Sequence, residues 1–242
     1  MQFIDSHIHL QDYKIKNAQQ IIAEMQKLGF VKVVCVSSHE DDWEQVAKLV
    51  DDNPDFIIPA FGIHPWNSAK VTTDWKTKLE ELIKKYPQAW IGECGLDRLK
   101  APSWKGQEEI FYYQTELAKK YKRPLNIHLL KAENDFHKYL SKLPTKFVLH
   151  SFSGSINFLN KVIACGGYIS LSKASFKRKI INDIITETPI SQILTESDFP
   201  YQSSYSDIPD VVEEIAHIKK VMPQQVWIAI NQNLSSINEH ND

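Results

Sequence analysis

The sequence lacks the features of membrane and secreted proteins. Its three cysteines, Cys35, Cys94 and Cys165, are widely spaced and form no C-x-x-C pair, which is typical of reduced intracellular thiols. No apolar run approaches the ~18 residues that a membrane span needs. The first strand is expected to begin at Gln2, which leaves no room for a signal peptide. We therefore expect a cytoplasmic protein without a membrane anchor.

A strong net charge and internal boundaries are lacking as well. The formal net charge is −2 over 242 residues, so any field that binds phosphate has to be local. No linker, low-complexity tract or change in composition divides the chain, and 43% of its residues are hydrophobic. This is enough for one sizeable core, so residues 1–242 are expected to form a single domain, with a monomer as the favoured state.

What the sequence does contain is a repeated alternation of short apolar runs and longer segments of helical period, which predicts parallel β/α units. The predicted strands are Gln2–Leu10, Val31–Ser37, Phe56–Ile63, Trp90–Leu96, Pro124–Leu129, Lys146–Phe152, Gly167–Leu171 and Ile193–Ser197. Helical segments such as Gln107–Lys122 and Ile156–Cys165 lie between them, and Pro223–Ile237 is expected to be an appendage. The pattern predicts a (β/α)8 TIM barrel. An open doubly wound sheet is the alternative, but its glycine-rich first turn is missing.

Polar residues occur at the C-terminal ends of these strands. The first strand ends in Asp5-Ser-His7-Ile-His9, and because side chains alternate faces, His7 and His9 point the same way. The ends of other strands carry Glu93, His128, His150 and Asp198. Each alone could be a buried histidine or a helix cap. Together they lie on the face where barrel active sites occur, and a metal would offset the cost of burying them.

The set of histidines and carboxylates without thiolates suits Zn, Mg or Mn and does not discriminate among them. Six ligands exceed what one tetrahedral ion needs. Two divalent ions bridged by Glu93, roughly 3.5–4 Å apart, would use them all.

Six motifs in this order resemble the TatD family of metal-dependent deoxyribonucleases, within the amidohydrolase superfamily. The motifs are DSHIHL at Asp5–Leu10, FGIHP at Phe61–Pro65, IGECGLD at Ile91–Asp97, NIH at Asn126–His128, LHSFSG at Leu149–Gly154 and TESDFP at Thr195–Pro200. The resemblance implies a TIM barrel that uses a water activated by two metals to hydrolyse phosphodiester bonds in DNA, usually from a strand end. It implies as metal ligands His7, His9, Glu93, His128, His150 and Asp198.

The chain departs from the family pattern in three places. Trp66 stands where relatives often have the second histidine of G-I-H-P-H. Lys131 follows Ile127-His128-Leu129-Leu130, where many relatives carry an arginine after I-H-x, and Arg98 stands where many carry an aromatic residue. The six expected ligands are intact, so these departures bear on the choice of substrate and not on metal binding.

Three residues are expected to take part in the reaction. Asp198 can accept the proton of the attacking water while also binding a metal. Glu196 is either a partner of a neighbouring histidine or a proton acceptor. His64 is expected to touch the substrate phosphate, with a structural loop histidine as the alternative.

Basic and aromatic residues lie in the loops after the strands. Arg98, Lys131, Lys177 and Arg178 are the expected donors to substrate phosphates, and solvated basic turns are the alternative. Lys100 lies in the same class of loop. Aromatic residues that either stack on bases or pack a loop onto the barrel are Trp66, Trp104, Tyr201 and Tyr205.

The sequence thus favours a DNA exonuclease that acts on single strands or strand ends. An amidohydrolase acting on a small amide, lactone or phosphoester is the alternative enzyme, because the same kind of metal site serves many bonds. A metal- or nucleic-acid-binding module without catalysis is a third possibility, and the intact Asp198 argues against it.

Overall fold

The computed structural model describes residues 1–13, 15–100, 102–144 and 146–239. Within them lies one eight-stranded sheet, in which parallel strands follow each other in chain order. The strands are β1 (Phe3–Ile8), β2 (Phe30–Val36), β3 (Ile57–Phe61), β4 (Trp90–Asp97), β5 (Leu125–Leu130), β6 (Phe147–Leu149), β7 (Tyr168–Leu171) and β8 (Ile193–Thr195). The seam between β8 and β1 is bridged by Thr195 Oγ1, which donates to the Ile4 carbonyl at 3.1 Å. The predicted (β/α)8 barrel is confirmed.

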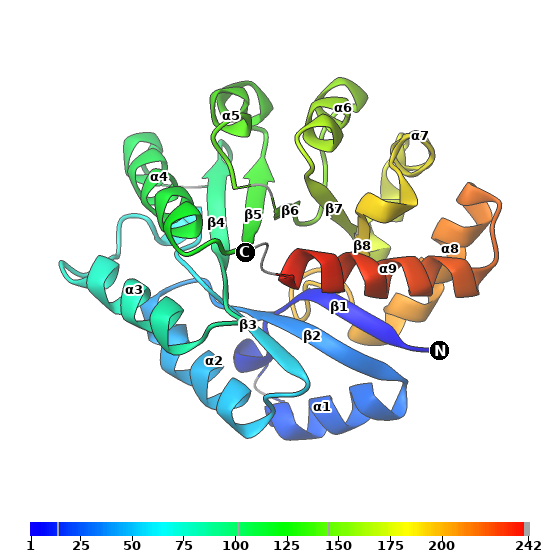
Figure 1. Cartoon of the computed structure of the whole chain (residues 1–242), viewed down its shortest axis with the longest axis horizontal. Coiled ribbons are helices and arrows are strands. Elements are labelled where there is room, and N and C mark those ends of the chain that lie inside the picture. The colour runs from blue at the N-terminus through cyan, green and yellow to red at the C-terminus, as the bar shows by residue number, and fades with distance from the viewer. Residues whose placement is uncertain (14, 101, 145, 240–242) are drawn as a thin grey trace.

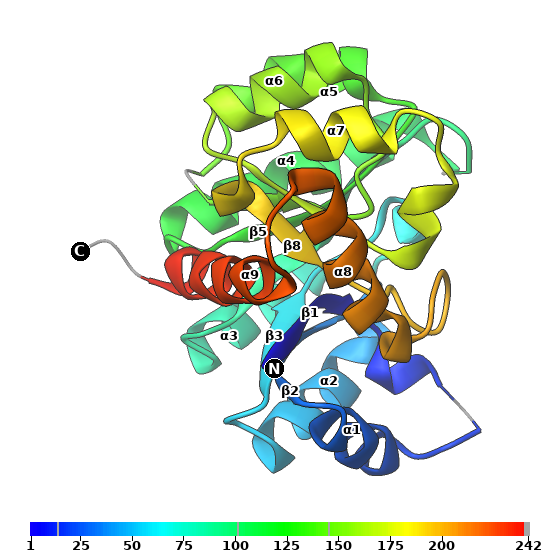
Figure 2. The same cartoon turned by 90° about the vertical axis from the view of Figure 1, so that its right-hand side faces the viewer.

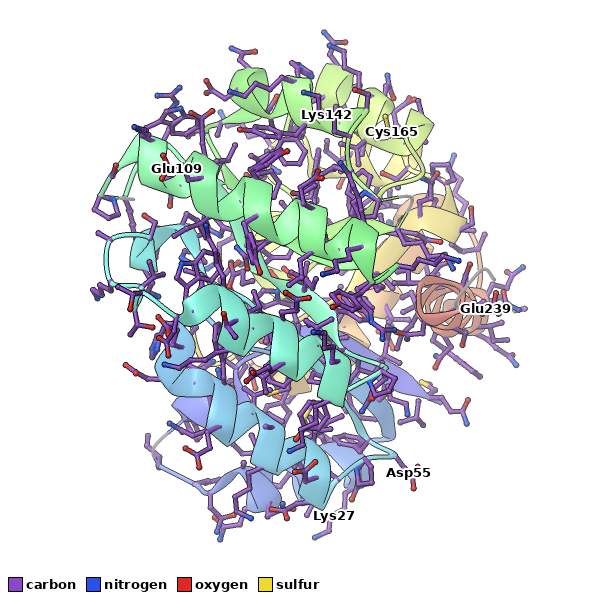
Figure 3. All side chains as sticks on the ribbon, turned by 60° about the vertical axis from the view of Figure 1, so that its left-hand side comes forward. Lys27, Asp55, Glu109, Lys142, Cys165 and Glu239 are labelled. Atoms are coloured by element: carbon purple, nitrogen blue, oxygen red, sulfur yellow. The ribbon has the colours of Figure 1, made fainter. Side chains whose placement is uncertain are left out.

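Helices form the outer ring around the strands (Figure 1). They are α1 (Ala18–Lys27), α2 (Glu40–Asp52), α3 (Trp75–Lys85), α4 (Trp104–Lys120), α5 (Glu133–Leu140), α6 (Ile156–Ala164), α7 (Ile181–Glu187) and α8 (Ile208–Lys219). Each buries an apolar stripe against the sheet, as Ile21, Ile22 and Met25 do in α1. Charged side chains such as Glu109 and Lys142 project outward (Figure 3). Among the described residues, no helix has the length and apolar character that crossing a membrane requires.

Several strands are shorter than predicted. Strand β6 ends at Leu149 instead of Phe152, and β8 ends at Thr195 instead of Ser197. Directly after them, Ser151 and Asp198 adopt left-handed conformations, with φ of 46° and 51°, which a strand does not accommodate. The polar residues of these motifs therefore lie on the first loop residues beyond the strands, at the same end of the barrel.

The C-terminal segment is a helix added to the eight β/α repeats, as expected, and it packs on the barrel. Helix α9 (Pro223–Asn238) lies across the end of the barrel where the strands begin (Figures 1 and 2). Trp90 Nε1, at the start of β4, donates to Asn238 Oδ1 at 2.7 Å. Asn233 Nδ2 donates to the carbonyls of Ile190 and Ile193, both at 2.8 Å. The helix closes the face opposite to the strand C-termini.

Replacing Asn233 by alanine is expected to lower the free energy of unfolding by about 1–3 kcal/mol, because buried carbonyls lose their donor. Urea denaturation measures the effect. The exposed Gln232 on the same helix offers a control, and Gln232→Ala is expected to stay within about 0.5 kcal/mol of the parent protein. Equal effects of the two substitutions would contradict the role of Asn233.

Candidate metal centre

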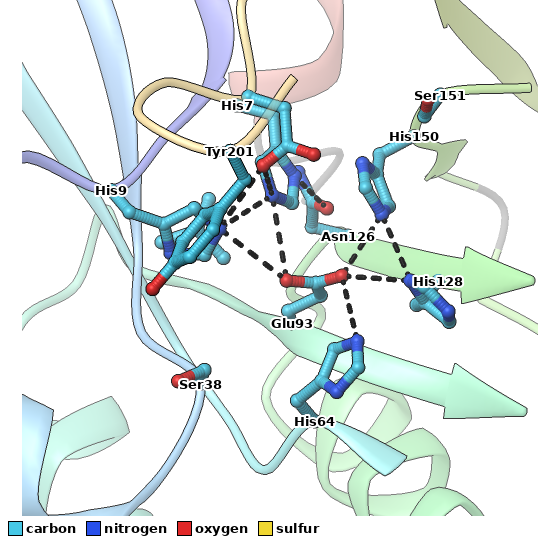
Figure 4. Close-up of polar contacts among 12 residues, drawn as sticks. His7, His9, Ser38, His64, Glu93, Asn126, His128, His150, Ser151 and Tyr201 are labelled. Atoms are coloured by element: carbon cyan, nitrogen blue, oxygen red, sulfur yellow. Dashed lines mark hydrogen bonds and ion pairs between the residues drawn. The ribbon is translucent and has the colours of Figure 1, made fainter. Parts of the chain in front are cut away.

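The six expected ligands converge at the C-terminal ends of the strands (Figure 4). His7 lies on β1, Glu93 on β4 and His128 on β5, whereas His9 and His150 directly follow β1 and β6, and Asp198 is the third residue after β8. His128 is partly buried and the others are buried. The β/α repeat produces this convergence, because it brings all strand C-termini to one mouth of the barrel.

Glu93 lies at the centre and presents its two carboxylate oxygens to two groups of residues. Its Oε2 lies 3.5 Å from His7 Nε2 and 3.6 Å from His9 Nε2. Its Oε1 lies 3.0 Å from His128 Nδ1 and 2.9 Å from His150 Nε2. Asp198 joins the first group, because its Oδ1 lies 3.4 Å from His9 Nε2. This division is the arrangement that a carboxylate bridging two ions would need.

The hydrogen bond of His7 Nδ1 shows that the other ring nitrogen, Nε2, is available to bind a metal. Asn126 Nδ2 donates to the Ser6 carbonyl at 3.2 Å, so Asn126 Oδ1 is the acceptor that faces His7 Nδ1 at 2.9 Å. His7 Nδ1 therefore carries the proton, and Nε2 presents its lone pair to the centre. A metal-binding histidine typically donates its other N–H to an oxygen in this way.

The other three histidines each have a carboxylate on the side away from Glu93, but only the one behind His128 lies within hydrogen-bond distance. Behind His128, Asp97 Oδ2 lies 3.4 Å from Nε2. Behind His150, Glu196 Oε1 lies 3.7 Å from Nδ1, and behind His9, Asp12 Oδ2 lies 4.0 Å from Nδ1. Each imidazole thus has an oxygen behind it and one nitrogen facing Glu93 or Asp198. Glu196 is fully buried and accepts a hydrogen bond from Ser170, so it lies behind His150 and not at the mouth of the barrel.

His64 differs from the expected ligands, because the ring nitrogen that faces Glu93 carries the proton. Its Nδ1 accepts the backbone N–H of Trp66 at 3.1 Å, so the proton of the neutral ring is on Nε2, which lies 3.2 Å from Glu93 Oε1. Burial lowers the pKa of His64 to about 4, which keeps the ring neutral near pH 7. A protonated nitrogen donates a hydrogen bond and offers no lone pair to a metal. His64 is therefore placed among the ligands as a donor.

The two carboxylates are held in their charged form. Burial favours the neutral form of Glu93, but the imidazoles that surround its carboxylate outweigh this effect and lower its pKa well below the usual value. Burial also opposes the ionisation of Asp198, whose pKa is nevertheless lowered by the hydrogen bond from His9 and by neighbouring imidazoles. Both groups are therefore suited to bind cations.

The donor set fits divalent metal ions. His7 Nε2 and His9 Nε2 lie 3.1 Å apart, and His128 Nδ1 and His150 Nε2 lie 3.2 Å apart. Lone pairs this close repel unless a proton or a cation lies between them. Among the described residues, His9 Nδ1 and His150 Nδ1 are buried without a hydrogen-bond partner, so the rings are not placed there by a hydrogen-bond network of their own. A cation in each group would account for the arrangement.

Two of the four expected phosphate donors are engaged by other parts of the protein. The Arg98 guanidinium binds Asp135 through two hydrogen bonds of 2.9 and 2.6 Å and lies 3.5 Å from the Trp104 ring centroid. Arg178 donates to the Phe152 and Ser153 carbonyls at 2.9 and 2.6 Å, which ties down the loop after β6. Lys131 and Lys177 are exposed. Lys131 also lines a small pocket of about 40 Å³ beside His150.

The four expected aromatic residues also separate into two classes. Trp104 is covered by Arg98, and the Tyr205 hydroxyl donates to Glu24 at 2.6 Å while its ring packs on Phe199. Trp66 and Tyr201 are 42% and 65% exposed at the mouth of the barrel. Sequence reasoning did not assign roles to Asn126 and Asp12. The position of Asn126 two residues before His128, on the same face of β5, is a signal that could have identified it.

Comparisons with known proteins agree with the motifs. The family described as TatD related DNase matches residues 4–238. The deoxyribonuclease Tat-D of Schizosaccharomyces pombe is 29% identical over 197 residues, which are 75% of this chain and 63% of that protein. The 3'-5' ssDNA/RNA exonuclease TatD of Edwardsiella piscicida is 27% identical over 75% of this chain and 73% of its own length. The crystal structure of the TatD homologue YJJV from Escherichia coli superposes with a TM-score of 0.87 at 21% identity, over 97% of both chains.

Proposed function

Because the chain belongs to the TatD related DNase family, we propose that it is a metal-dependent nuclease that hydrolyses phosphodiester bonds at the ends of single-stranded DNA. One observation carries the proposal, namely the central position of Glu93 between two groups of ligands. The relative from Edwardsiella piscicida, whose name describes an exonuclease for single-stranded DNA and RNA, supports the choice of substrate.

One divalent ion would be held by His7, His9, Asp198 and Glu93, and a second by His128, His150 and Glu93. When bound, such a pair of ions lowers the pKa of a water and neutralises the charge on phosphate oxygens. Zn, Mn and Mg all suit these nitrogen and oxygen donors.

Asp198 is the proton acceptor in the proposed mechanism. Its Oδ2 accepts a hydrogen bond from Gln202 Nε2 at 2.6 Å, which holds the carboxylate in place. Its Oδ1 faces His7 and His9 and can take the proton that an attacking water loses. Glu196 lies behind His150, with its Oε1 3.7 Å from Nδ1, where its charge can orient that ring. This position favours the partner role of Glu196 over that of a proton acceptor.

His64 stabilises the substrate in this mechanism. Its Nε2–H points toward the centre and can donate to an oxygen of the phosphate as negative charge builds up there. The exposed ammonium groups of Lys131 and Lys177 are proposed to attract the following phosphates. Arg98 and Arg178 hold the loops that surround them.

Digestion of end-labelled DNA tests the proposal. Single-stranded DNA labelled at either end is incubated with protein that has been stripped and reloaded with Mg, Mn or Zn, beside a panel of amides, lactones and small phosphoesters. We expect stepwise release of nucleotides from one end, and metal analysis is expected to give two ions per chain. Hydrolysis of the small molecules without cleavage of nucleic acid would overturn the proposal in favour of an amidohydrolase.

Replacing His64 by alanine is expected to lower kcat by about 10²- to 10³-fold, as the loss of a donor to the transition state does. The metal content is expected to stay unchanged, because His64 presents an N–H and no lone pair to the centre. His128→Ala is the matched comparison and is expected to lose metal. Loss of metal from His64→Ala, measured by atomic emission, would instead make His64 a ligand.

A further inference from the structure

An exposed aromatic side chain lies on each side of the metal centre. Each one donates a hydrogen bond to a carboxylate that faces one of the expected histidine ligands. The Tyr201 hydroxyl donates to Asp12 Oδ2 at 2.8 Å, and this oxygen faces His9. Trp66 Nε1 donates to Asp97 Oδ2 at 2.5 Å, and this oxygen faces His128. We call Trp66 and Tyr201 the aromatic pair. Neither ring can turn freely, because its polar atom is bound to the wall of the site.

The aromatic pair lies on opposite sides of Glu93. The Tyr201 ring contacts His9 edge-on, with centroids 5.2 Å apart, and His9 faces Glu93 Oε2. The Trp66 ring contacts His64 edge-on at 4.9 Å, and His64 faces Glu93 Oε1. Figure 4 shows Tyr201 beside His9, with His64 beyond Glu93. A phosphate held over Glu93 would therefore have one ring toward each of its two neighbouring nucleosides.

Both side chains are partly exposed. Tyr201 is 65% exposed, and Trp66 is 42% exposed and has the Lys100 ammonium over its ring, 4.7 Å from the centroid. The Lys100 side chain is flexible and exposed, so a base can take its place on the ring while the ammonium moves toward a phosphate. Proteins that bind single-stranded nucleic acid combine aromatic rings, on which bases stack, with basic groups that contact the phosphates.

On the basis of the proposed function, we infer that Trp66 and Tyr201 form a stacking clamp for the bases on either side of the phosphate that is cleaved. The clamp selects unpaired ends, because a base that stacks on a protein ring has to leave its neighbours in a duplex. Trp66 stands where relatives often carry a histidine, so this half of the clamp is not expected in relatives with that histidine.

Binding of an oligonucleotide that resists cleavage tests the clamp separately from catalysis. The metal-loaded protein is titrated into a labelled, phosphorothioate-linked single strand of about eight nucleotides, and anisotropy gives the Kd. Trp66→Ala and Tyr201→Ala are each expected to weaken binding by roughly tenfold or more. Trp66→Phe and Tyr201→Phe keep a ring and are expected to stay within about threefold of the parent protein. Tyr112→Ala is the control, because Tyr112 is an equally exposed aromatic residue on α4.

A second ligand identifies the contact that is lost. An oligonucleotide with abasic residues at its end offers the same phosphates without bases, and it is expected to bind the parent protein and both alanine variants equally. A blunt duplex is expected to bind more weakly than the single strand. The clamp is overturned if the alanine substitutions weaken the abasic ligand as much as the intact one. It is also overturned if phenylalanine and alanine variants lose the same affinity, because the effect would then come from the hydrogen bonds to Asp97 and Asp12.

The failure of the clamp and that of the proposed function give different results. If the alanine variants bind and digest single-stranded DNA as the parent protein does, the clamp is wrong and the nuclease assignment stands. If the parent protein cleaves no nucleic acid with any of the three metals, the proposed function is wrong.

Discussion

Replacing Glu93 by glutamine is expected to reduce hydrolysis by on the order of 10³-fold or more and to lower the metal content. Glutamine has nearly the same shape, so the core around it is preserved. It loses the negative charge and offers one oxygen instead of two, although the structure places ligands on both sides of the carboxylate. Steady-state kinetics on single-stranded DNA, together with atomic emission, measure the two effects.

Glu81→Gln is the matched control, because Glu81 is an exposed carboxylate on α3. This substitution is expected to change neither activity nor metal content. A Glu93→Gln protein that still holds its full complement of metal and works at the parent rate would refute the central position that we assign to Glu93. Circular dichroism of the variant shows whether the fold is kept.

The largest expected effect on stability comes from Gly95→Ala. Gly95 pairs with His128 across β4 and β5 and has a φ of +147°, which side chains rarely adopt. A methyl group there would lie 1.9 Å from the His128 carbonyl oxygen. Strain and overpacking together are expected to lower the free energy of unfolding by about 2–6 kcal/mol, measured by urea denaturation. The same shift would displace His128, so the metal affinity is expected to fall as well.

Gly106→Ala is the contrasting substitution. Gly106 lies in the first turn of α4, and a methyl group there would meet Ser103 Oγ at an ordinary distance of 3.5 Å. Alanine is also the better helix former, so a gain of up to about 1 kcal/mol is expected. If Gly95→Ala were as stable as Gly106→Ala, the close approach of β4 and β5 would not limit this position.

The fold and the positions of the expected ligands follow from patterns that are local in the sequence. Each strand and helix shows its own period of apolar residues, and a chain of β/α units brings every strand end to one face. His7, Glu93 and Asp198 could therefore be assigned to one site although they are far apart in the chain. Exact boundaries, such as the early end of β8, depend on backbone turns that composition does not reveal.

Only the tertiary structure decided what each side chain does at that site. The proton position on His64 depends on a backbone N–H of the following loop, and the availability of Arg98, in the turn after β4, depends on Asp135 on α5. Likewise, the packing of α9 across the strand N-termini rests on hydrogen bonds between segments far apart in the chain. The sequence by itself determined the barrel and the residues that gather at its mouth, because these follow from local periodicity and strand ends, and its six motifs carried the resemblance to the family. The proton positions on the histidines, the exposure of the side chains and their hydrogen-bond partners depend on contacts between residues far apart in the chain. These contacts exist only in the folded protein.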